Sequence, residues 1–281
     1  MRLSVITDEF TQDLSEAIRF AKEYDLDALE LRTIDDLPIE QLSENRLCEI
    51  GSLIHEAGLS VCNLAGSFGK CLYRDRENEK EKLEKLIRAA KILDVSYIRG
   101  FGFFSEDGPS IEEAAKALVD PVKRLEQEGI TLLLEADPSV TTTNHRALRK
   151  LIERIDRPNV GAIYDPGNDI WDPQGEKPFP DGWNEVKTST RHIHIKDARM
   201  TKDGAQAVKV GSGEVDFPSI LKAVRDSGYE GFLSLETHYR VQGDLSEEQM
   251  KTPGGAAFSS GGWQACRESM EALKNFLKIT E

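Results

Sequence analysis

Residues 192–198 read HIHIKDA, and three other stretches also end a short strand pattern on polar groups: LLLEADP at 132–138, AIYDPGND at 162–169 and LSLETHY at 233–239. Each has the length and the apolar content of a buried strand. Because the carboxyl ends of parallel strands meet at one edge or mouth, the polar groups that follow are expected to lie together. The four stretches therefore predict a parallel α/β fold with one polar site at the strand ends.

The rest of the chain repeats this pattern, with short apolar runs alternating with amphipathic segments such as 14–25 and 81–93. Such alternation is typical of βα units around a parallel sheet. Eight strands are predicted, at Leu3–Thr7, Ala28–Leu31, Ser60–Leu64, Tyr97–Arg99, Thr131–Glu135, Val160–Tyr164, His192–Lys196 and Phe232–Leu235. Without a dividing linker, the 281 residues are expected to form one (β/α)8 barrel of the TIM type over residues 1–281.

A doubly wound sheet is the structural alternative. It usually has a Gly-rich phosphate turn after its first strand, whereas here that position reads TDEF at residues 7–10. Three segments break the βα pattern, at 66–78, 165–188 and 243–262. Since loops at the strand ends of a barrel build its pocket, these segments are expected to form the pocket walls.

The overall charge limits the possible partners. The formal net charge is −14, which disfavours binding to nucleic acid or to an anionic membrane surface. The N-terminal residues do not resemble a signal peptide, and no apolar run is long enough to cross a membrane, so a cytoplasmic protein is expected. The four cysteines, Cys48, Cys62, Cys71 and Cys266, are scattered and are interpreted as reduced packing residues.

The strand ends carry the groups expected to do chemistry. Alternation along the seventh strand puts His192, His194 and Lys196 on one face, which must point into the barrel mouth. Several carboxylates gathered there would repel one another unless a cation lay among them. The set Glu135, Asp165, His194 and Glu236 is therefore predicted to bind one divalent metal ion, most simply Mn²⁺, Mg²⁺ or Co²⁺, with Zn²⁺ as a further possibility.

These residues resemble the xylose-isomerase-like barrel superfamily, in particular its sugar phosphate isomerase/epimerase branch. That branch also contains ketose 3-epimerases, inosose dehydratases and apurinic-site endonucleases. The likeness extends over nearly the whole chain and includes GSGEVDF at 211–217 and SGYEGFLSLE at 227–236. In the branch, a Glu closes the fifth strand, an Asp follows the sixth, the second His of H-x-H closes the seventh and a Glu closes the eighth. These match the four predicted metal ligands.

The resemblance implies that Glu135 and Glu236 exchange protons with substrate carbon on opposite faces. A carboxylate that removes the proton next to a carbonyl gives an enediolate, which can lead to epimerisation, isomerisation or loss of hydroxide. The expected enzyme is a metal-dependent isomerase or epimerase acting on a small-molecule carbohydrate, free or phosphorylated. A dehydratase of the inosose or dehydroshikimate type is the alternative. Barrels of this type commonly pair, so a homodimer is possible.

Further polar residues at the strand ends are candidates for substrate contacts: Glu30, Arg32, Arg99, Asn168, His192, Lys196 and His238. The two arginines could equally be paired with neighbouring acids, and His192 could be a packing residue. Asn168 occupies a position at which many members of the branch have His, and it cannot act as an imidazole ligand. Trp171 and Phe68 lie in the irregular segments and could cover a sugar face.

Two other functions remain as alternatives. A nuclease is disfavoured by the negative charge and by the small number of histidines, five, of which His55 is expected on the outer second helix. A non-catalytic sugar-binding barrel is disfavoured by the presence of both Glu135 and Glu236, because a binding protein has no need for two opposed bases.

Overall fold

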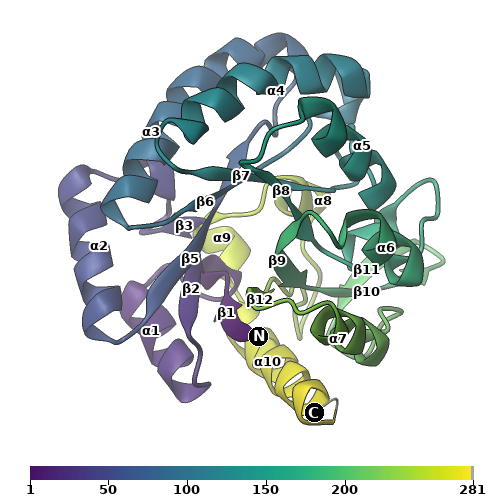
Figure 1. Ribbon diagram of the computed structural model, residues 1–281. Helices are drawn as coiled ribbons and strands as arrows, with labels where there is room; N and C mark the ends of the chain where they lie inside the picture. The colour runs from purple at the N-terminus through teal and green to yellow at the C-terminus, as the bar shows by residue number, and fades with distance from the viewer. Residues whose placement is uncertain (280–281) are drawn as a thin grey trace.

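Eight parallel strands surround the axis of the molecule, and helices cover them on the outside (Figure 1). The computed structural model describes residues 1–279. The barrel strands are β1 (Arg2–Val5), β2 (Ala28–Leu31), β5 (Ser60–Phe68), β6 (Tyr97–Gly100), β7 (Thr131–Glu135), β8 (Val160–Tyr164), β9 (Thr190–Ile195) and β12 (Phe232–Leu235). Neighbouring strands pair in parallel from β2 round to β1, and a bridge between Ile6 and Glu30 closes the ring. The predicted (β/α)8 barrel is confirmed.

All eight predicted strands are present; β2, β7, β8 and β12 have the predicted bounds, and the ends of the other four differ by a few residues. The largest difference is in β5, which continues to Phe68, where that residue pairs with Gly100 of β6. The predicted irregular segment therefore does not begin at residue 66. Phe68 is buried in the apolar core, so the suggestion that it covers a substrate is wrong. A strand that bends through a register irregularity is not visible in an apolar pattern.

The helices begin at residues suited to that position. Asp13 accepts hydrogen bonds from the backbone N–H groups of Ser15 and Glu16, and Asp216 accepts one from Ser219. Such caps satisfy N–H groups that the first helical turn leaves unpaired. The outer helices are α1 (Leu14–Glu23), α2 (Glu44–Glu56), α3 (Glu79–Ile92), α4 (Ile111–Glu126), α5 (His145–Ile155), α6 (Trp183–Val186), α7 (Phe217–Asp226) and α10 (Gly262–Ile279). Their apolar faces pack on the strands and form the main core.

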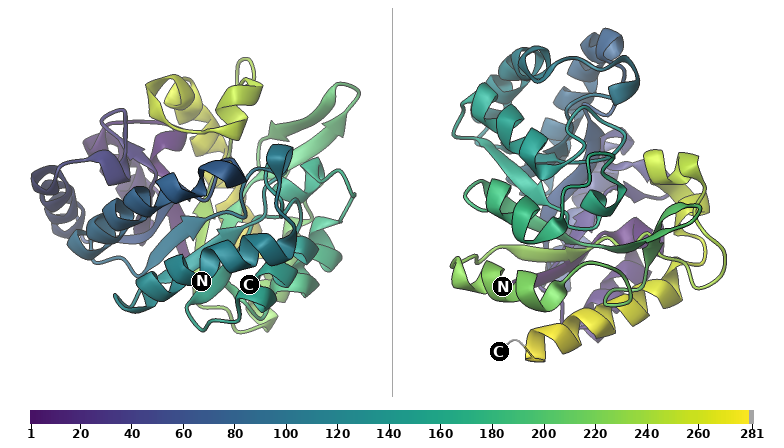
Figure 2. Two further views of the ribbon diagram at one scale, coloured as in Figure 1. Left: turned by 90° about the horizontal axis from the view of Figure 1, so that it is seen from above. Right: turned by 90° about the vertical axis from the view of Figure 1, so that its right-hand side faces the viewer.

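Additional elements gather at the end of the barrel where the strands finish, opposite both termini (Figure 2). They are the hairpin β10 (Asp197–Thr201) and β11 (Gly204–Val208), the short pair β3 (Thr33–Ile34) and β4 (Leu37–Pro38), and the helices α8 (Glu247–Lys251) and α9 (Gly255–Ser259). The segment 243–262 was predicted to be irregular, but it contains both of these short helices. The structure thus places a substantial covering over the strand ends.

The interpretation of the four cysteines as reduced packing residues agrees only in part with the structure. All four cysteines are free, and Cys62 and Cys266 are buried, but Cys48 is exposed and is not a packing residue. His55 lies exposed on α2, as predicted. None of the helices in the described part of the chain is both long and apolar enough to cross a membrane.

Candidate active site

The strand ends open into a cavity of about 890 Å³. Glu135, Glu236 and Lys196 line its inner part, and residues of the β10–β11 turn and of α8 line its outer part. Carboxylates directly after apolar strands thus face a space large enough for a small ligand. The cavity is the candidate active site.

The four predicted metal ligands form one cluster, of which Glu135 and Glu236 line the cavity whereas Asp165 and His194 are not among its lining residues. Glu135 ends β7, Asp165 follows β8, His194 lies in β9 and Glu236 follows β12, and all four are buried. One ligand atom from each lies within 4.8 Å of the others. Nδ1 of His194 is 2.8 Å from Oε1 of Glu135, 3.3 Å from Oε2 of Glu236 and 4.0 Å from Oδ2 of Asp165. Three carboxylates therefore surround one imidazole nitrogen.

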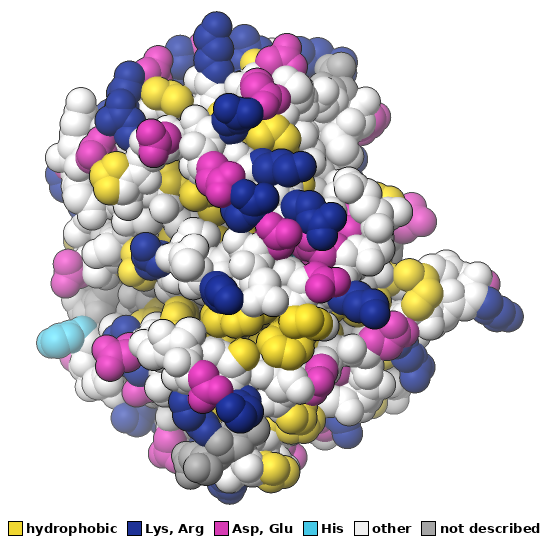
Figure 3. All heavy atoms as spheres, turned by 45° about the vertical axis from the view of Figure 1, so that its right-hand side comes forward, with side chains coloured by type: hydrophobic (Ala, Val, Ile, Leu, Met, Phe, Trp, Pro, Cys, Tyr) yellow, Lys and Arg dark blue, Asp and Glu magenta, His cyan; other side chains and the backbone are white. Residues whose placement is uncertain are grey.

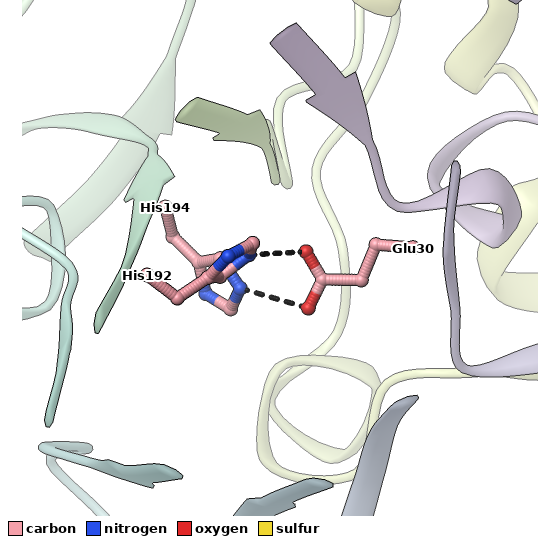
Figure 4. Close-up of side chains that lie close together, drawn as sticks. All are labelled: Glu30, His192 and His194. Atoms are coloured by element: carbon pink, nitrogen blue, oxygen red, sulfur yellow. Dashed lines mark hydrogen bonds and ion pairs between the residues drawn. The ribbon is translucent and has the colours of Figure 1, made fainter. Parts of the chain in front are cut away.

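The other nitrogen of His194 faces Glu30 (Figure 4). Oε1 of Glu30 is 3.1 Å from Nε2 of His194, and its Oε2 is 2.8 Å from Nε2 of His192. Asn63 donates a further hydrogen bond of 2.7 Å to Glu30. These contacts fix the orientation of the His194 ring and leave Nδ1 directed at the cluster.

Glu30 and His192 were predicted as substrate contacts, and the structure corrects this prediction. Both are fully buried and neither lines the cavity. His192 precedes His194 by two residues on the same face of β9, so it lies one layer deeper in the barrel interior. The packing interpretation of His192 is the one that agrees with the structure.

Three cations contact the carboxylates. Nζ of Lys196 is 2.6 Å from Oδ2 of Asp165 and 3.0 Å from Oε2 of Glu236. Nη1 of Arg99 is 3.0 Å from Oε2 of Glu135 and 3.2 Å from Oε1 of Glu236. All three predicted cations, Arg32 included, line the cavity while being paired with acids.

Asp8 and Glu9 belong to the site although sequence reasoning missed them. Nε of Arg32 is 3.1 Å from Oδ1 of Asp8, its Nη2 is 3.0 Å from Oε1 of Glu9, and its Nη1 is 2.9 Å from Oε1 of Glu236. Glu9 also accepts a hydrogen bond from the backbone N–H of His238, whose side chain lines the cavity. The signal was present, because an acidic pair directly follows the first strand.

Burial and neighbouring charges move the pKa values of these groups in opposite directions. Burial opposes the charged form of Glu135, but the positive charges of His194 and Arg99 outweigh it and lower the pKa of this carboxyl. Burial raises the pKa of Asp165 to about 7, with Glu135 and Glu236 adding to the increase and Lys196 opposing it. Burial alone would lower the pKa of His194, yet the surrounding glutamates raise it well above its usual value. Without a further cation in the cluster, His194 and Asp165 therefore retain their protons at pH values below these raised pKa values.

The donor set fits a divalent ion. Carboxylate oxygens and one imidazole nitrogen are suitable ligands for Mn²⁺, Mg²⁺, Co²⁺ and Zn²⁺. Nδ1 of His194 points at the carboxylates while Glu30 holds Nε2, which is the usual arrangement of a metal-ligating histidine. The high pKa of His194 and the raised pKa of Asp165 indicate a centre that attracts positive charge.

The segment after β8 forms one wall of the cavity. Asn168 and Trp171 line it, and Nδ2 of Asn168 donates a 2.9 Å hydrogen bond to the backbone oxygen of Ala136. Nδ1 of His145, at the start of α5, lies 2.8 Å from Oδ2 of Asp169, and both side chains are fully buried. This pair attaches the segment to the barrel, and no sequence pattern singled it out.

Comparison with known proteins identifies relatives among enzymes of carbohydrate chemistry. The chain is 25% identical to an inosose dehydratase of Clostridium perfringens over 44% of this chain and 48% of the relative. It is 22% identical to an inosose isomerase of Halalkalibacterium halodurans over 85% of this chain and 88% of the relative. The chain spans about half the length of the first curated relatives that it matches.

Solved structures share the fold. A probable 3-DHS dehydratase, AsbF, from Bacillus anthracis superposes with a TM-score of 0.74 at 20% identity, covering 98% of this chain and 99% of that one. A D-psicose 3-epimerase from Clostridium cellulolyticum H10 superposes with a TM-score of 0.74 at 17% identity and covers 100% of both chains. The IOLI protein, solved with a zinc atom, gives 0.71 at 18% identity, covering 98% of this chain and 99% of that one.

The profile of one protein family, described as the xylose isomerase-like TIM barrel, matches residues 18–273. The match includes seven of the eight barrel strands and all four residues of the carboxylate and imidazole cluster. The chain belongs to the xylose isomerase-like TIM barrel family.

Proposed function

We propose that this protein is a divalent-metal-dependent isomerase or epimerase of a small sugar-like carbonyl compound, acting as one barrel domain. The observation that carries the proposal is the clustering of Glu135, Asp165, His194 and Glu236, two of which, Glu135 and Glu236, line the cavity. Relatives that are named as isomerases and epimerases support the reaction class.

Glu135, Asp165, His194 and Glu236 are the proposed ligands of one ion, with Mn²⁺, Mg²⁺ or Co²⁺ as first choices. The zinc atom in the related IOLI protein keeps Zn²⁺ open. When bound, a divalent ion would polarise the substrate carbonyl and stabilise the charge of an enediolate.

Glu135 and Glu236 are the proposed acid and base. Both have pKa values held down by neighbouring cations, His194 and Arg99 in one case and Lys196 and His194 in the other, although burial opposes the charged form in each. A carboxylate that is ionised at neutral pH can accept the proton next to a carbonyl. The other carboxyl group would return a proton to the opposite face or to the neighbouring carbon.

Arg99 and Arg32 have a positioning role in this proposal. Arg99 contacts both Glu135 and Glu236, and it also donates hydrogen bonds to the backbone oxygens of Ala65 and Gly66. Arg32 contacts the same oxygen of Glu236, Oε1, as Arg99 does. These contacts restrict the carboxylates to one orientation before substrate enters, which lowers the reorganisation needed for proton transfer.

Dehydration is the second candidate, because several relatives are named inosose dehydratases and one similar structure is a probable 3-DHS dehydratase. The first step would be the same removal of a proton next to the carbonyl. Hydroxide would then leave from the adjacent carbon, with protonation by a carboxylic acid, so that water is the second product. Asp165 is poorly placed to be the carboxylic acid that protonates the leaving hydroxide, because it does not line the cavity.

A small molecule is proposed as substrate in preference to a nucleic acid. On the face drawn in Figure 3, Lys and Arg side chains are interspersed with Asp and Glu, and no broad basic area is seen there. A nucleic-acid-binding face usually gathers basic side chains in one patch.

A homodimer remains part of the proposal.

Solvent exchange tests the reaction. The Mn²⁺-supplemented protein is incubated in D₂O with ketoses and with inosose, and each recovered compound is examined by NMR. Deuterium is expected at the carbon next to the carbonyl, in substrate or product. The rate of deuterium incorporation is expected to fall by about 10²-fold or more in Glu135→Gln or Glu236→Gln. Turnover of any of these substrates without deuterium incorporation would exclude the enediolate route.

A further inference from the structure

We propose that the cavity takes an uncharged polyhydroxy ketone, and that Lys70 and Asp137 form a subsite for two of its hydroxyl groups. This inference rests on the proposed function and specifies its substrate class. It selects uncharged sugars and cyclitols over sugar phosphates and carboxylated rings.

Lys70 and Asp137 form a nearly buried ion pair on the cavity wall. Nζ of Lys70 is 2.8 Å from Oδ2 of Asp137, and the side chains are 5% and 15% exposed. Oδ1 of Asp137 accepts hydrogen bonds from the backbone and hydroxyl groups of Ser139. A paired ammonium and carboxylate offer a donor beside an acceptor, which suits adjacent hydroxyl groups and gives no net charge to attract an anion.

Phe101 gives this subsite an apolar surface. The Lys70 ammonium lies 4.9 Å from the centroid of the Phe101 ring, and both residues line the cavity. Trp171 is a second aromatic side chain on the cavity wall. Sugars and cyclitols carry C–H groups between their hydroxyls, so an aromatic ring beside polar groups is suited to them.

Among the described residues, five of the six Lys and Arg side chains that line the cavity are paired with an acid, and the sixth, Lys202, lies in the exposed β10–β11 turn. Lys196 contacts Asp165 and Glu236, and Lys251 lies 3.5 Å from Glu106. The two arginines are paired with Asp8, Glu9, Glu135 and Glu236. A phosphate or carboxylate would have to compete with these acids for each paired cation.

Glu40 adds a further acidic group. Its side chain is 5% exposed, it lines the cavity, and its Oε2 has no hydrogen-bond partner among the described residues. This oxygen is closed to solvent, so Glu40 adds an acidic group to the cavity wall and no direct contact to a ligand.

The charges around the proposed metal support the same conclusion. The six carboxylates there, of Asp8, Glu9, Glu30, Glu135, Asp165 and Glu236, exceed by two the four guanidinium and ammonium groups that contact them, of Arg32, Arg99, Lys196 and Arg240. The cations of the cluster are thus outnumbered by the carboxylates that they contact, which leaves no spare cation for an anionic substrate group.

The test compares binding of matched compounds to the Mn²⁺-supplemented full chain by calorimetry. The pairs are D-fructose with D-fructose 6-phosphate, and inosose with 3-dehydroshikimate. In each pair the uncharged member is expected to bind at least about tenfold more tightly. Tighter binding of the charged members, or no binding of either uncharged member, would overturn the inference. Because calorimetry detects binding whether or not the ligand is turned over, failure of the proposed reaction would be seen separately, in the deuterium experiment.

Asp137→Asn tests the subsite directly. It leaves Lys70 unpaired, so the preference is expected to shift about tenfold towards the 6-phosphate. Asp226→Asn is the matched control, since Asp226 forms a Lys–Asp pair with Lys222 on exposed α7; it should leave the preference unchanged. If Asp137→Asn does not fold, Lys70→Gln is used, and it should weaken binding of D-fructose without a gain for the phosphate. An unchanged preference in a folded variant would contradict the subsite.

Discussion

Glu30 contacts His194, one of the four proposed metal ligands, and does not line the cavity. It contacts Nε2 of His194 at 3.1 Å. Glu30→Gln is therefore expected to lower the affinity for Mn²⁺ by about 10- to 100-fold, because the imidazole loses the carboxylate that orients it and increases its basicity. Titration of the chelator-treated protein with Mn²⁺ measures this change.

The control for this variant is Glu84→Gln, which removes a carboxylate from an exposed ion pair with Arg124 on the outer helices. It should leave the affinity for Mn²⁺ unchanged. Equal affinities of wild type and Glu30→Gln would mean that Glu30 does not support the metal-binding group.

The pKa directions at His194 and Asp165 predict a pH-dependent centre. The pKa of His194 is raised well above its usual value and that of Asp165 to about 7, so the metal-free centre holds protons on both below pH 7. A metal ion must displace these protons. Affinity for Mn²⁺ should therefore rise as pH increases from 6 to 8, more steeply below 7, where both protons must be displaced, than above 7, with protons released into a weakly buffered indicator solution. Affinity that stays constant over this range would be inconsistent with these ligands.

Residues that end a strand could be found from the sequence. Buried residues that contact the site without lining the cavity could not be told apart from residues that line it. Glu135, Asp165, His194 and Glu236 follow apolar runs, and this position alone brings them to the mouth of a barrel. Whether an inward-facing residue reaches the cavity or lies one layer below depends on strand stagger around the barrel. That dependence explains why Glu30 and His192 were placed with the substrate.

At the scale of elements, one buried pair is among the contacts that attach the segment after β8. His145 and Asp169 attach it to α5 at 2.8 Å, and Asn168 and Trp171 lie on the same segment in the cavity wall. Asp169→Asn should lower the free energy of unfolding by about 1–3 kcal/mol, because it weakens a buried hydrogen-bonded pair. Chemical denaturation measures this change.

A matched control lies on the same segment. Asp181 is exposed, so Asp181→Asn should change the stability by less than about 0.5 kcal/mol. Equal stabilities of the two variants would show that the His145–Asp169 pair does not hold the segment.

The regular elements were predictable and the covering of the cavity was not. The strands and helices carry periodic apolar patterns, such as those of β7 and α1, that burial in the core requires. The β10–β11 hairpin has intermediate burial and a short polar turn, and α8 has five residues of which none is buried. Elements with so little apolar surface leave no pattern that distinguishes them from a loop.

At the scale of the whole molecule, the barrel brings residues that are distant in sequence to one mouth. Ion pairs connect Arg32 of the N-terminal part with Glu236, and Arg99 with both Glu135 and Glu236. The site therefore forms only when the ring of strands is complete, from β1 to β12. The fold follows from the repeated βα pattern, but the match of cations to carboxylates follows from side-chain geometry that no single strand contains.

The central claim is that Glu135, Asp165, His194 and Glu236 together bind one divalent ion. It is tested most directly by elemental analysis of protein prepared with added Mn²⁺ and then dialysed. Wild-type protein is expected to retain about one ion per chain, and the Glu135→Gln/Glu236→Gln double variant, shown to be folded by circular dichroism, almost none. Wild-type protein without a bound divalent metal, or equal retention by the double variant, would contradict the account.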